Sequence, residues 1–536
     1  MHRRDLSRGL LAALVSHPTK AQAETTLACG KPCYPPTPAE AVNGLAPSDI
    51  SIPPGNVLRW GADPTGAVDS TDAIQRAVNV AWASGNYASP WSGQGGATPV
   101  VIFPPGRYRV TNTVTVPTGV TLRGMGHPAN TASHTRIIMD SPGTTDNRDK
   151  PIFRFNRATL DRSALMNAAI ASTIQELEFW YVTLEGTFDL PHRGRGIPFG
   201  RYPNGGALLF DVDATDTRIV NCVFQHAPAA IRIKSVPRSP GKRGDGWRGE
   251  RGVGIFVENC EFDASCTHVF ATASELDLQF KACQFYGAMH RYEGCTGKVN
   301  YQSGRWHGGA YVDAATVRNE FLKFELKAAD IEVGAQPFLR LDRATLIDIS
   351  QNAMLGGLGG GNCIEVTDAD GGGILSNVIS DSGSDSSAGA GSAHFAAAIK
   401  LRGCQHVLVA SNNITATGAA AYSGFGILCD DSSRPSRNNF INGNAVSAPY
   451  NGASYNAQNR YVNVSPGDVL GINYNSHEAE AGQVARDLPV AKLGLRAGSR
   501  PTSVRESNVT LFVDEADGSL KALFPNGVVK TLATDS

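Results

Sequence analysis

The sequence predicts an all-β protein built from stacked coils of short strands, and three observations support this fold class. The 536 residues include 58 glycines and 30 prolines, which is above average usage and favours many turns over long helices. Short runs rich in β-branched residues, such as 100–103 and 114–116, are separated by Pro and Gly turns. One pattern of apolar positions also recurs along the chain, as repeat architectures require.

The recurring pattern is clearest in residues 217–224, 255–262 and 278–285, which share alternating apolar positions, a Cys and a final Phe. Looser copies follow as Ile349/Asn352/Met354, Ile374/Asn377/Ile379, Val409/Asn412/Ile414 and Ile441/Asn444/Val446. Because each coil buries its face against its neighbours, like residues should stack in columns. The interval 285–354 could hold two or three coils, so about eight to eleven coils are expected, with strands about 4.8 Å apart.

The repeats also explain residue types that would otherwise suggest chemistry. Cys222, Cys260 and Cys283 are expected to form an internal stack of small buried thiols. The recurring Asn residues fit turn ladders, because Asn tolerates left-handed backbone. Cys29 and Cys33 could close a small disulfide loop in an oxidising compartment, and whether they pair stays open.

The N-terminal segments are predicted to lie outside the coils. Residues 1–23 combine Arg3-Arg4, a short apolar run at 9–15 and a small-x-small cleavage site at 21–23. They resemble a twin-arginine export signal, which predicts a bacterial protein that is periplasmic or secreted. Residues 24–56 are rich in Pro without periodicity and are expected to be an arm or linker.

Residues 57–475 are predicted to form the coiled body, which opens with a helix. Asp69-Ser70-Thr71 supplies N-cap chemistry. One apolar helix face then follows, formed by Ala73, Ile74, Ala77, Val78 and Ala81.

This opening carries a family resemblance over about residues 57–126. Its residues are Trp60-Gly61-Ala62-Asp63, Gly66, Asp69-Ser70-Thr71, Ala73-Ile74-Gln75, the run 103–108 and the run 122–126. They resemble the N-terminal signature of the pectate-lyase-like superfamily, which includes polygalacturonase-related enzymes and many phage tailspikes. The resemblance implies a right-handed parallel β-helix whose N-terminal end is plugged by the helix after Ser70. The polygalacturonase motif set is incomplete, so Arg232-Ile233-Lys234 is interpreted as coincidental strand sequence.

Residues 476–536 are predicted to form a small C-terminal β-meander. Its three strands are expected at 509–513, 520–524 and 528–532, with turn signals at Asp517-Gly518 and Asn526-Gly527. A cap on the coils or a contact within a homotrimer would each fit.

Outward positions on the strands supply the catalytic candidates, because side chains alternate along a strand. Grouped carboxylates could serve a hydrolase, and a basic group could serve a lyase that removes the α-proton of a uronate. The candidates are Glu258, Asp263, Asp277, Lys281 and Arg291, with His268 and Tyr301 as further bases. The alternative is an ordinary solvated strand face.

Two basic insertions, near 190–206 and 236–252, are expected to flank a groove over residues 216–293. Arg can bind carboxylates through two hydrogen bonds, and an indole can stack on a sugar. The predicted substrate-binding residues are Arg193, Arg195, Arg201, Trp247, Arg248 and His268. Flexible basic loops without a specific ligand are the alternative.

The functional expectation is a secreted enzyme that degrades a polysaccharide by hydrolysis or elimination, with an acidic glycan as one candidate substrate. The alternative is a non-catalytic glycan-binding protein or tailspike-like adhesin. A net charge of −1 argues against nucleic acid as partner, and no apolar run is long enough to span a membrane. No calcium-loop spacing or nucleotide fingerprint appears, so no metal or cofactor is predicted, and calcium is unsupported.

Overall fold

The computed structural model describes two compact units, residues 1–477 and 478–536. The described residues are 25–26, 32–84, 99–117, 119–126, 134–141, 146–156, 169–170, 172–182, 202–211, 214–234, 253–263, 267–308, 310–314, 322–333, 337–356, 363–380, 397–415, 425–430, 436–447, 462–463, 467–470, 474–475, 497–498, 510–514, 519–524 and 528–533.

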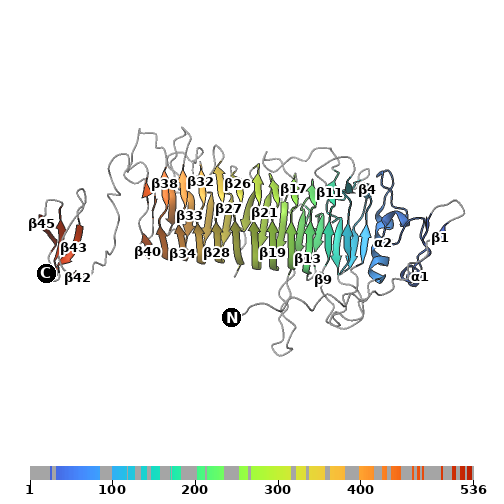
Figure 1. Ribbon diagram of the computed structural model, residues 1–536, viewed down its shortest axis with the longest axis horizontal. Helices are drawn as coiled ribbons and strands as arrows, with labels where there is room; N and C mark the ends of the chain where they lie inside the picture. Colours follow the sequence, from blue (N-terminus) through green and yellow to red (C-terminus); the bar gives the residue numbers. More distant parts are fainter. Residues whose placement is uncertain are drawn as a thin grey trace, which may run out of the picture. The chain divides into compact units, whose positions relative to one another are not determined.

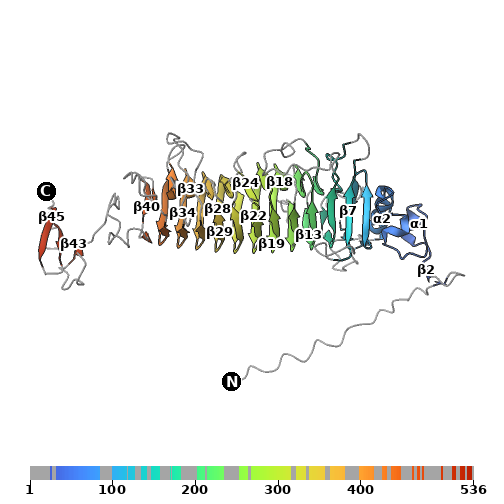
Figure 2. The same cartoon turned by 90° about the horizontal axis from the view of Figure 1, so that it is seen from above.

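The first unit is a right-handed parallel β-helix, as the sequence predicts. Each coil contributes one strand to each of three parallel sheets, and successive coils lie side by side along the helix (Figures 1 and 2). In the described residues, twelve coils contribute to all three sheets, and β40 and β41 begin another. The predicted eight to eleven coils were too few. The early coils lack the Cys or Asn of the recurring pattern, and Trp306 and Ile331 mark two coils inside the interval 285–354.

The strands of the three sheets are as follows. Sheet 1 contains β3 (Val100–Ile102), β6 (Thr121–Arg123), β9 (Ala169–Ile170), β10 (Thr173–Gln175), β13 (Ala214–Val220), β16 (Val253–Glu258), β19 (Glu275–Lys281), β22 (Thr296–Gln302), β25 (Leu322–Lys327), β28 (Ala344–Ser350), β31 (Asp370–Leu375), β34 (Gln405–Ala410), β37 (Arg437–Asn442) and β40 (Gly467–Leu470). Sheet 2 contains β4 (Gly106–Val110), β7 (Thr135–Met139), β11 (Glu178–Tyr181), β14 (Val223–Gln225), β17 (Glu261–Asp263), β20 (Gln284–Tyr286), β23 (Arg305–His307), β26 (Asp330–Val333), β29 (Ala353–Gly356), β32 (Val378–Ser380), β35 (Asn413–Thr415), β38 (Ala445–Ser447) and β41 (Tyr474–Asn475). Sheet 3 contains β5 (Val114–Pro117), β8 (Phe153–Asn156), β12 (Leu208–Phe210), β15 (Ile231–Lys234), β18 (Thr267–Thr272), β21 (Met289–Glu293), β24 (Tyr311–Ala314), β27 (Leu339–Asp342), β30 (Ile364–Thr367), β33 (Ala397–Arg402), β36 (Phe425–Asp430) and β39 (Val462–Asn463).

The N-terminal end of the β-helix is covered by the predicted helix, α2 (Thr71–Ser84), which packs on β3 and β5. The 3₁₀ helix η1 (Val57–Trp60) and the short helix α1 (Pro38–Val42) lie beside it. Helix α1 belongs to the segment predicted as an arm. It is anchored because Glu40 and Arg59 form an ion pair of 2.6 Å with neither side chain exposed. β1 (Thr25–Thr26) and β2 (Pro32–Cys33) form a small antiparallel pair.

The segment before and within α2 also satisfies the open strand edges of the first coil. Gly55 O accepts from Ile102 N of sheet 1, and Pro64 O accepts from Arg107 N of sheet 2. In sheet 3, the Gln75 side-chain amide accepts from Thr115 N at 2.8 Å and donates to Thr115 O at 3.0 Å. An unpaired parallel edge would invite another strand, so this segment terminates all three sheets.

The corner between sheets 1 and 2 has the same two-residue form in ten successive coils. Its first residue has a left-handed backbone in every case: Glu176, Asn221, Asn259, Ala282, Ser303, Ala328, Gln351, Ser376, Ser411 and Gly443. Its second residue, at the inward position, is Leu177, Cys222, Cys260, Cys283, Gly304, Ala329, Asn352, Asn377, Asn412 and Asn444.

This corner explains both predicted columns. Cys222, Cys260 and Cys283 are buried free thiols, and the Cys222 N–H lies 3.4 Å from Cys260 Sγ. The thiol stack is therefore confirmed. Asn221 and Asn259 adopt the left-handed turn as expected, with φ of 52°. Asn352, Asn377, Asn412 and Asn444 instead form a buried ladder in which each amide donates to the next amide oxygen at 2.9 Å.

The core contains a column of rings and one chain of polar groups. Phe179, Phe224, Phe262, Phe285 and Trp306 follow one another with centroids 4.3 to 5.1 Å apart. Beside them, Tyr292, Tyr301, His290 and His268 are hydrogen bonded in series, ending on Tyr286 O. Since that carbonyl can only accept, His268 Nε2 donates to it. Each earlier group then donates to the next: Tyr292 to Tyr301, Tyr301 to His290, and His290 to His268. Both histidines can therefore stay neutral.

The second unit contains the predicted C-terminal meander. β43 (Thr510–Asp514), β44 (Leu520–Leu523) and β45 (Val529–Ala533) pair antiparallel in order, and β42 (Ala497–Gly498) pairs with β43. Within the described residues, no helix combines the length and apolar character needed to cross a membrane.

Candidate functional site

One outward row of sheet 2 gathers aromatic and acidic side chains over neighbouring coils. Trp180 on β11 pairs with Gln225 on β14, which pairs with Asp263 on β17. Phe262 pairs with Phe285, so Asp263 lies opposite Tyr286 on β20, and Tyr286 pairs with His307 on β23. The adjacent outward row contains Glu178, Val223, Glu261, Gln284 and Arg305. We call these two rows together the sheet 2 face.

The N-terminal end of the sheet 2 face is built around Trp180. The Arg136 guanidinium lies 4.6 Å from the Trp180 ring centroid and donates to Glu178 Oε2 at 2.8 Å. His134 Nε2 contacts the same carboxylate oxygen. Glu178 can be buried on an outward row because the Arg136 guanidinium pairs with its charge. This cluster holds the indole in a fixed orientation.

His226 stands beside Trp180 in an unusual backbone conformation. Its ring lies 4.5 Å from the Trp180 ring, and its φ is 56°. Two coils with the same turn use Gly287 and Gly308 at this position, where a side chain costs about 1–2 kcal/mol. Burial lowers the pKa of His226, and the nearby Arg136 charge lowers it further, while Asp263 and Glu178 oppose the shift. The imidazole is therefore neutral near pH 7, and the charges of Asp263 and Glu178 both act on it.

The centre of the sheet 2 face is a pair of carboxylates on one strand. Glu261 and Asp263 are two residues apart on β17 and point outward together, with Cα atoms about 7 Å apart. The Tyr286 hydroxyl donates to Gln284 Oε1 at 2.8 Å. Burial raises the pKa of Tyr286, and the charges of Glu261 and Asp263 raise it further. The phenol therefore stays protonated beside the two carboxylates.

The C-terminal end of the sheet 2 face is a second aromatic platform. The Tyr286 and His307 rings stack with centroids 5.1 Å apart and an interplanar angle of 21°. His307 Nδ1 lies 3.9 Å from Glu332 Oε2, which also accepts from Gly308 N at 3.1 Å. The carboxylate pair therefore has ring systems on both sides along the helix axis.

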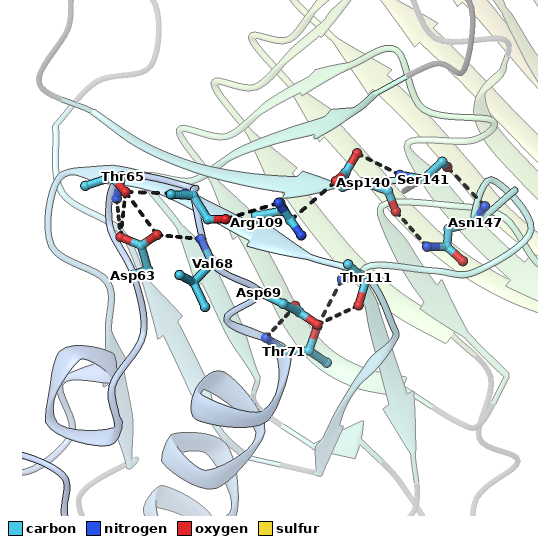
Figure 3. A network of polar contacts seen from close by, with 11 residues as sticks. Asp63, Thr65, Val68, Asp69, Thr71, Arg109, Thr111, Asp140, Ser141 and Asn147 are labelled. Carbon is cyan, nitrogen blue, oxygen red and sulfur yellow. Dashed lines mark hydrogen bonds and ion pairs between the residues drawn. The ribbon is translucent and has the colours of Figure 1, made fainter. Parts of the chain in front are cut away.

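A polar network near the cap holds the start of sheet 2 (Figure 3). Arg109 lies in the same outward row as Trp180, two coils earlier. Its guanidinium bonds to Ala67 O at 3.2 Å and lies 3.3 Å from Asp140 Oδ2. Asp69 accepts from the side chains of Thr71 and Thr111 at 2.7 and 2.6 Å. These bonds tie the capping loop to the first strand of sheet 2 and are structural.

The five predicted catalytic residues lie on three different sheets rather than in one groove. Asp263 is on sheet 2, Arg291 is on sheet 3, and Glu258, Asp277 and Lys281 are on sheet 1. Glu258 pairs in register with Lys281, and their side chains form an exposed ion pair of 3.1 Å. Asp277 pairs with Gly254, four residues before Glu258, so the two carboxylates are about 13 Å apart along the strand direction.

Two predicted bases do not face outward. His268 and Tyr301 have no exposed surface and belong to the hydrogen-bonded chain in the core. Tyr301 falls on the inward side of the alternation in β22, and His268 lies at a register shift in β18, where five successive residues are buried. Contact of His268 with a substrate is therefore contradicted.

The remaining predicted binding residues, Arg193, Arg195, Arg201, Trp247 and Arg248, lie outside the described residues, as do residues 1–23 and Cys29. The two insertions that carry the binding residues connect β11 to β12 and β15 to β16. One connection enters sheet 3 at the start of β12 and the other leaves it at the end of β15. The strands of sheet 3 therefore lie between the two attachment points. Within the described residues, no group of three or more His, Cys, Asp or Glu side chains could hold a metal ion.

Trp180 and His226 were missed although the sequence carries a signal for both. Ile174, Leu177 and Phe179 reproduce the spacing of Ile219, Cys222 and Phe224. Extending the pattern back by one coil aligns Trp180 with Gln225 and Asp263, as the register confirms.

Comparisons with known proteins agree with this fold. Residues 55–181 match the family model described as rhamnogalacturonase A/epimerase, pectate lyase-like. No curated protein sequence matches the chain. Similar solved structures include a DFA-IIIase variant from Arthrobacter chlorophenolicus A6 in complex with DFA-III, at 14% identity and a TM-score of 0.50, covering 77% of this chain and 98% of that one.

Two further similar structures have lower TM-scores. Tailspike protein 3 of bacteriophage CBA120 is 10% identical with a TM-score of 0.44, covering 90% of this chain and 69% of that one. The surface adhesin PfbA of Streptococcus pneumoniae is 13% identical with a TM-score of 0.42, covering 89% and 99%. At these identities the likeness concerns the fold alone. The three-sheet β-helix and the matched N-terminal segment together confirm the predicted resemblance to the pectate-lyase-like superfamily.

Proposed function

We propose that this chain binds a polysaccharide along the sheet 2 face and hydrolyses a glycosidic bond at Glu261 and Asp263. The observation that carries the proposal is the carboxylate pair on β17 with ring systems on both sides, Trp180 and His226 at one end and Tyr286 and His307 at the other. Aromatic rings present flat apolar surfaces to sugar rings. A glycan lying along the helix axis would place one linkage over the carboxylates.

The chemistry needs one carboxyl to protonate the leaving oxygen and a second to attack the sugar or activate water. A Cα separation of about 7 Å on one strand allows the carboxylate separations that these two mechanisms use. Tyr286 can donate a hydrogen bond without becoming charged, since its pKa is raised. His226, neutral near pH 7, can accept a proton from water.

Elimination is the less favoured reaction because it needs a cation to neutralise the substrate carboxylate. Beside Trp180, the Arg136 guanidinium already pairs with Glu178. Among the described residues of the sheet 2 face, this leaves Arg305, whose charge acts on Tyr286, as the cation that elimination would need. Hydrolysis makes no such demand on either arginine.

The test is an activity screen on neutral and uronate polysaccharides that follows reducing ends and the ultraviolet absorbance of unsaturated uronates. Reducing ends without that absorbance are expected. Asp263→Asn and Glu261→Gln should each lower turnover by about 10²–10⁴-fold. Glu258→Gln and Asp277→Asn, on sheet 1, are the matched controls and should keep full activity. Absorbance with unimpaired Asp263→Asn would overturn the hydrolase proposal.

Glycan binding without cleavage is the second candidate, and Glu178 favours it. This carboxylate is buried and held by Arg136 and His134, as suits a rigid recognition surface. Binding that survives Asp263→Asn, with no product from any substrate, would select this candidate. Export from a bacterium and assembly as a homotrimer remain parts of the proposal that rest on the sequence.

A further inference from the structure

The apolar core contains a chain of polar groups that the proposed hydrolysis does not use. It runs from Tyr292 through Tyr301, His290 and His268 to the backbone oxygen of Tyr286. None of these four side chains has any exposed surface, and phenylalanine rings pack against both imidazoles. Apolar side chains of the same shape can often replace such buried pairs with little loss of stability. Stability alone therefore does not explain the chain.

His268 is turned into the core by a β-bulge. Thr267 pairs with Met289 and Val269 pairs with His290, so His268 is the extra residue of β18 opposite β21. Bulges are common next to functional sites, where they redirect a side chain. Here the bulge directs the imidazole to the backbone of the neighbouring coil, where His268 Nε2 lies 3.1 Å from Tyr286 O.

Tyr286 O lies at the end of a strand of the sheet 2 face. The pairing of β20 with β17 ends at Phe285, opposite Phe262. Tyr286 follows as the last residue of β20, and Gly287 after it has a φ of 66°. The bond from His268 therefore holds the last peptide group of β20, from which the Tyr286 side chain points outward and stacks on His307.

The imidazole of His268 has one defined orientation. Burial lowers its pKa to about 3, so near pH 7 the ring has one N–H to donate and one nitrogen to accept. The N–H donates to Tyr286 O, and the other nitrogen accepts from His290 at 3.3 Å. A rotation of the ring would break both bonds at once, which is costly for buried groups.

We propose that His268 is a positioning residue, which holds the Tyr286 ring in place for the glycan through the Tyr286 carbonyl. The hold on Tyr286 rests on the hydrogen-bonded chain, whereas the contact of Tyr286 with a glycan rests on the proposed function. The ring would contact the substrate in the ground state and in the transition state alike. Loss of the bond should therefore raise KM and leave kcat nearly unchanged.

The direct test follows the Tyr286 ring in the full chain without any substrate. A 3-fluorotyrosine label at position 286 alone leaves Tyr292 and Tyr301 unchanged and reports the surroundings of the ring through its ¹⁹F chemical shift. His268→Phe removes the donor and should move or broaden this signal. His268→Gln should restore it, because the amide can donate to the same carbonyl. An unmoved signal in His268→Phe would overturn the proposal.

Val257→Ala is the matched control. Val257 is 1% exposed and lies on β16, in the same coil as His268 but on sheet 1. Its truncation should lower the melting temperature through lost packing and leave the ¹⁹F signal unchanged. An equal change of the signal in Val257→Ala would show that the ring responds to any loss of stability, and a specific role of His268 would be excluded.

Kinetics measure the consequence for the site. The substrate is polygalacturonate or a soluble β-glucan, whichever releases reducing ends. His268→Phe should raise KM about fivefold or more and change kcat less than about twofold, and His268→Gln should restore KM. A lower kcat with unchanged KM would contradict the proposed role. If neither polysaccharide is cleaved, the proposed function fails, and the ¹⁹F signal still decides whether His268 positions Tyr286.

A second variant tests the same chain if His268→Phe does not fold. Tyr301→Phe removes the hydroxyl that donates to His290 Nδ1 at 2.8 Å. Since His290 in turn holds His268, the ¹⁹F signal should move in the direction opposite to no change in the control, by less than the loss of the whole bond would cause. A signal identical to that of the parent chain would count against the positioning chain.

Discussion

Single residues decide whether the sheet 2 face is catalytic, and His226 is the most informative of them. It occupies a left-handed turn for which two later coils use Gly287 and Gly308. A position that favours Gly but contains His at a candidate site suggests that the imidazole is retained for its chemistry.

His226→Gly should therefore preserve the fold and lose activity, by about 10²–10⁴-fold if the imidazole is the base. Because the pKa of His226 lies below its ordinary value, the activity of the parent chain should stay constant down to about pH 6.5 and fall only below it. Melting curves and a pH–rate profile measure both effects. Ala273→Gly, at a left-handed turn between β18 of sheet 3 and β19 of sheet 1, is the control. Full activity in His226→Gly would exclude the imidazole from the mechanism.

At this scale the sequence singled out one residue of the proposed site, Asp263, and did not single out Trp180 or His226. Asp263 was recognisable because its coil carries the Cys and Phe of the repeat. Trp180 lies in a coil with Leu177 at the Cys position, so its alignment was not evident. His268 shows the reverse problem, since a register shift next to it in β18 turns it inward, and no local sequence signal marks that shift.

Among the structural elements, the asparagine ladder makes the most specific contribution to stability. Asn377 Nδ2 donates to Ile349 O and to Asn412 Oδ1, and its Oδ1 accepts from both nitrogens of Asn352, all at 2.9 to 3.1 Å. Every polar atom of this buried amide is paired, so the ladder joins four coils.

Asn377→Ala should lower the free energy of unfolding by about 3 kcal/mol or more, because several buried groups lose their partners at once. Cys260→Ala, at the equivalent corner of an earlier coil, removes one sulfur from an apolar stack and should cost about 1–2 kcal/mol. Urea denaturation of both variants measures the difference. Equal losses would mean that the ladder adds nothing beyond packing.

Element prediction succeeded where a pattern was local. Helix α2 follows from an N-cap and one apolar face, and the meander strands follow from turn signals. Helix α1 was missed although Thr37 and Glu40 form a capping box and Pro38 opens the helix, because five residues are too few to show an apolar periodicity.

For the whole molecule, the buried histidines couple stability to pH. Burial lowers the pKa of His268 to about 3, and burial lowers that of His290 as well. The unfolded chain binds protons at these groups below about pH 6.5, and the folded chain does not. Their contribution to stability is therefore complete above about pH 6.5 and is lost as the pH falls toward the folded pKa.

The free energy of unfolding should thus fall by about 1.4 kcal/mol per pH unit for each histidine below that pH. Urea titrations between pH 7 and pH 5 measure the slope. His268→Phe should make the slope smaller, even though it lowers stability at neutral pH. An unchanged slope would assign the acid sensitivity to other groups.

The fold class was predictable at this scale because the same residue types, such as Cys, Asn and Phe, recur at equivalent positions of successive coils. Such recurrence in the sequence alone indicates that the coils stack. The location of the site was not, because an outward residue can lie on any of three sheets. To assign an outward residue to a sheet, one must know how many residues connect successive strands in each coil. The long connections at 182–207 and 235–252 hide these numbers in the sequence.

The uniform corner between sheets 1 and 2 has an evolutionary and engineering consequence. Residues 328–350 begin at one such corner and end just before the next, so their excision would join Lys327 to Gln351 with the corner geometry unchanged. Chain length in this protein can thus change in modular steps, one whole coil at a time. A shortened variant would present a shorter rod while keeping the same end cap, and gene duplication could lengthen it by the same unit.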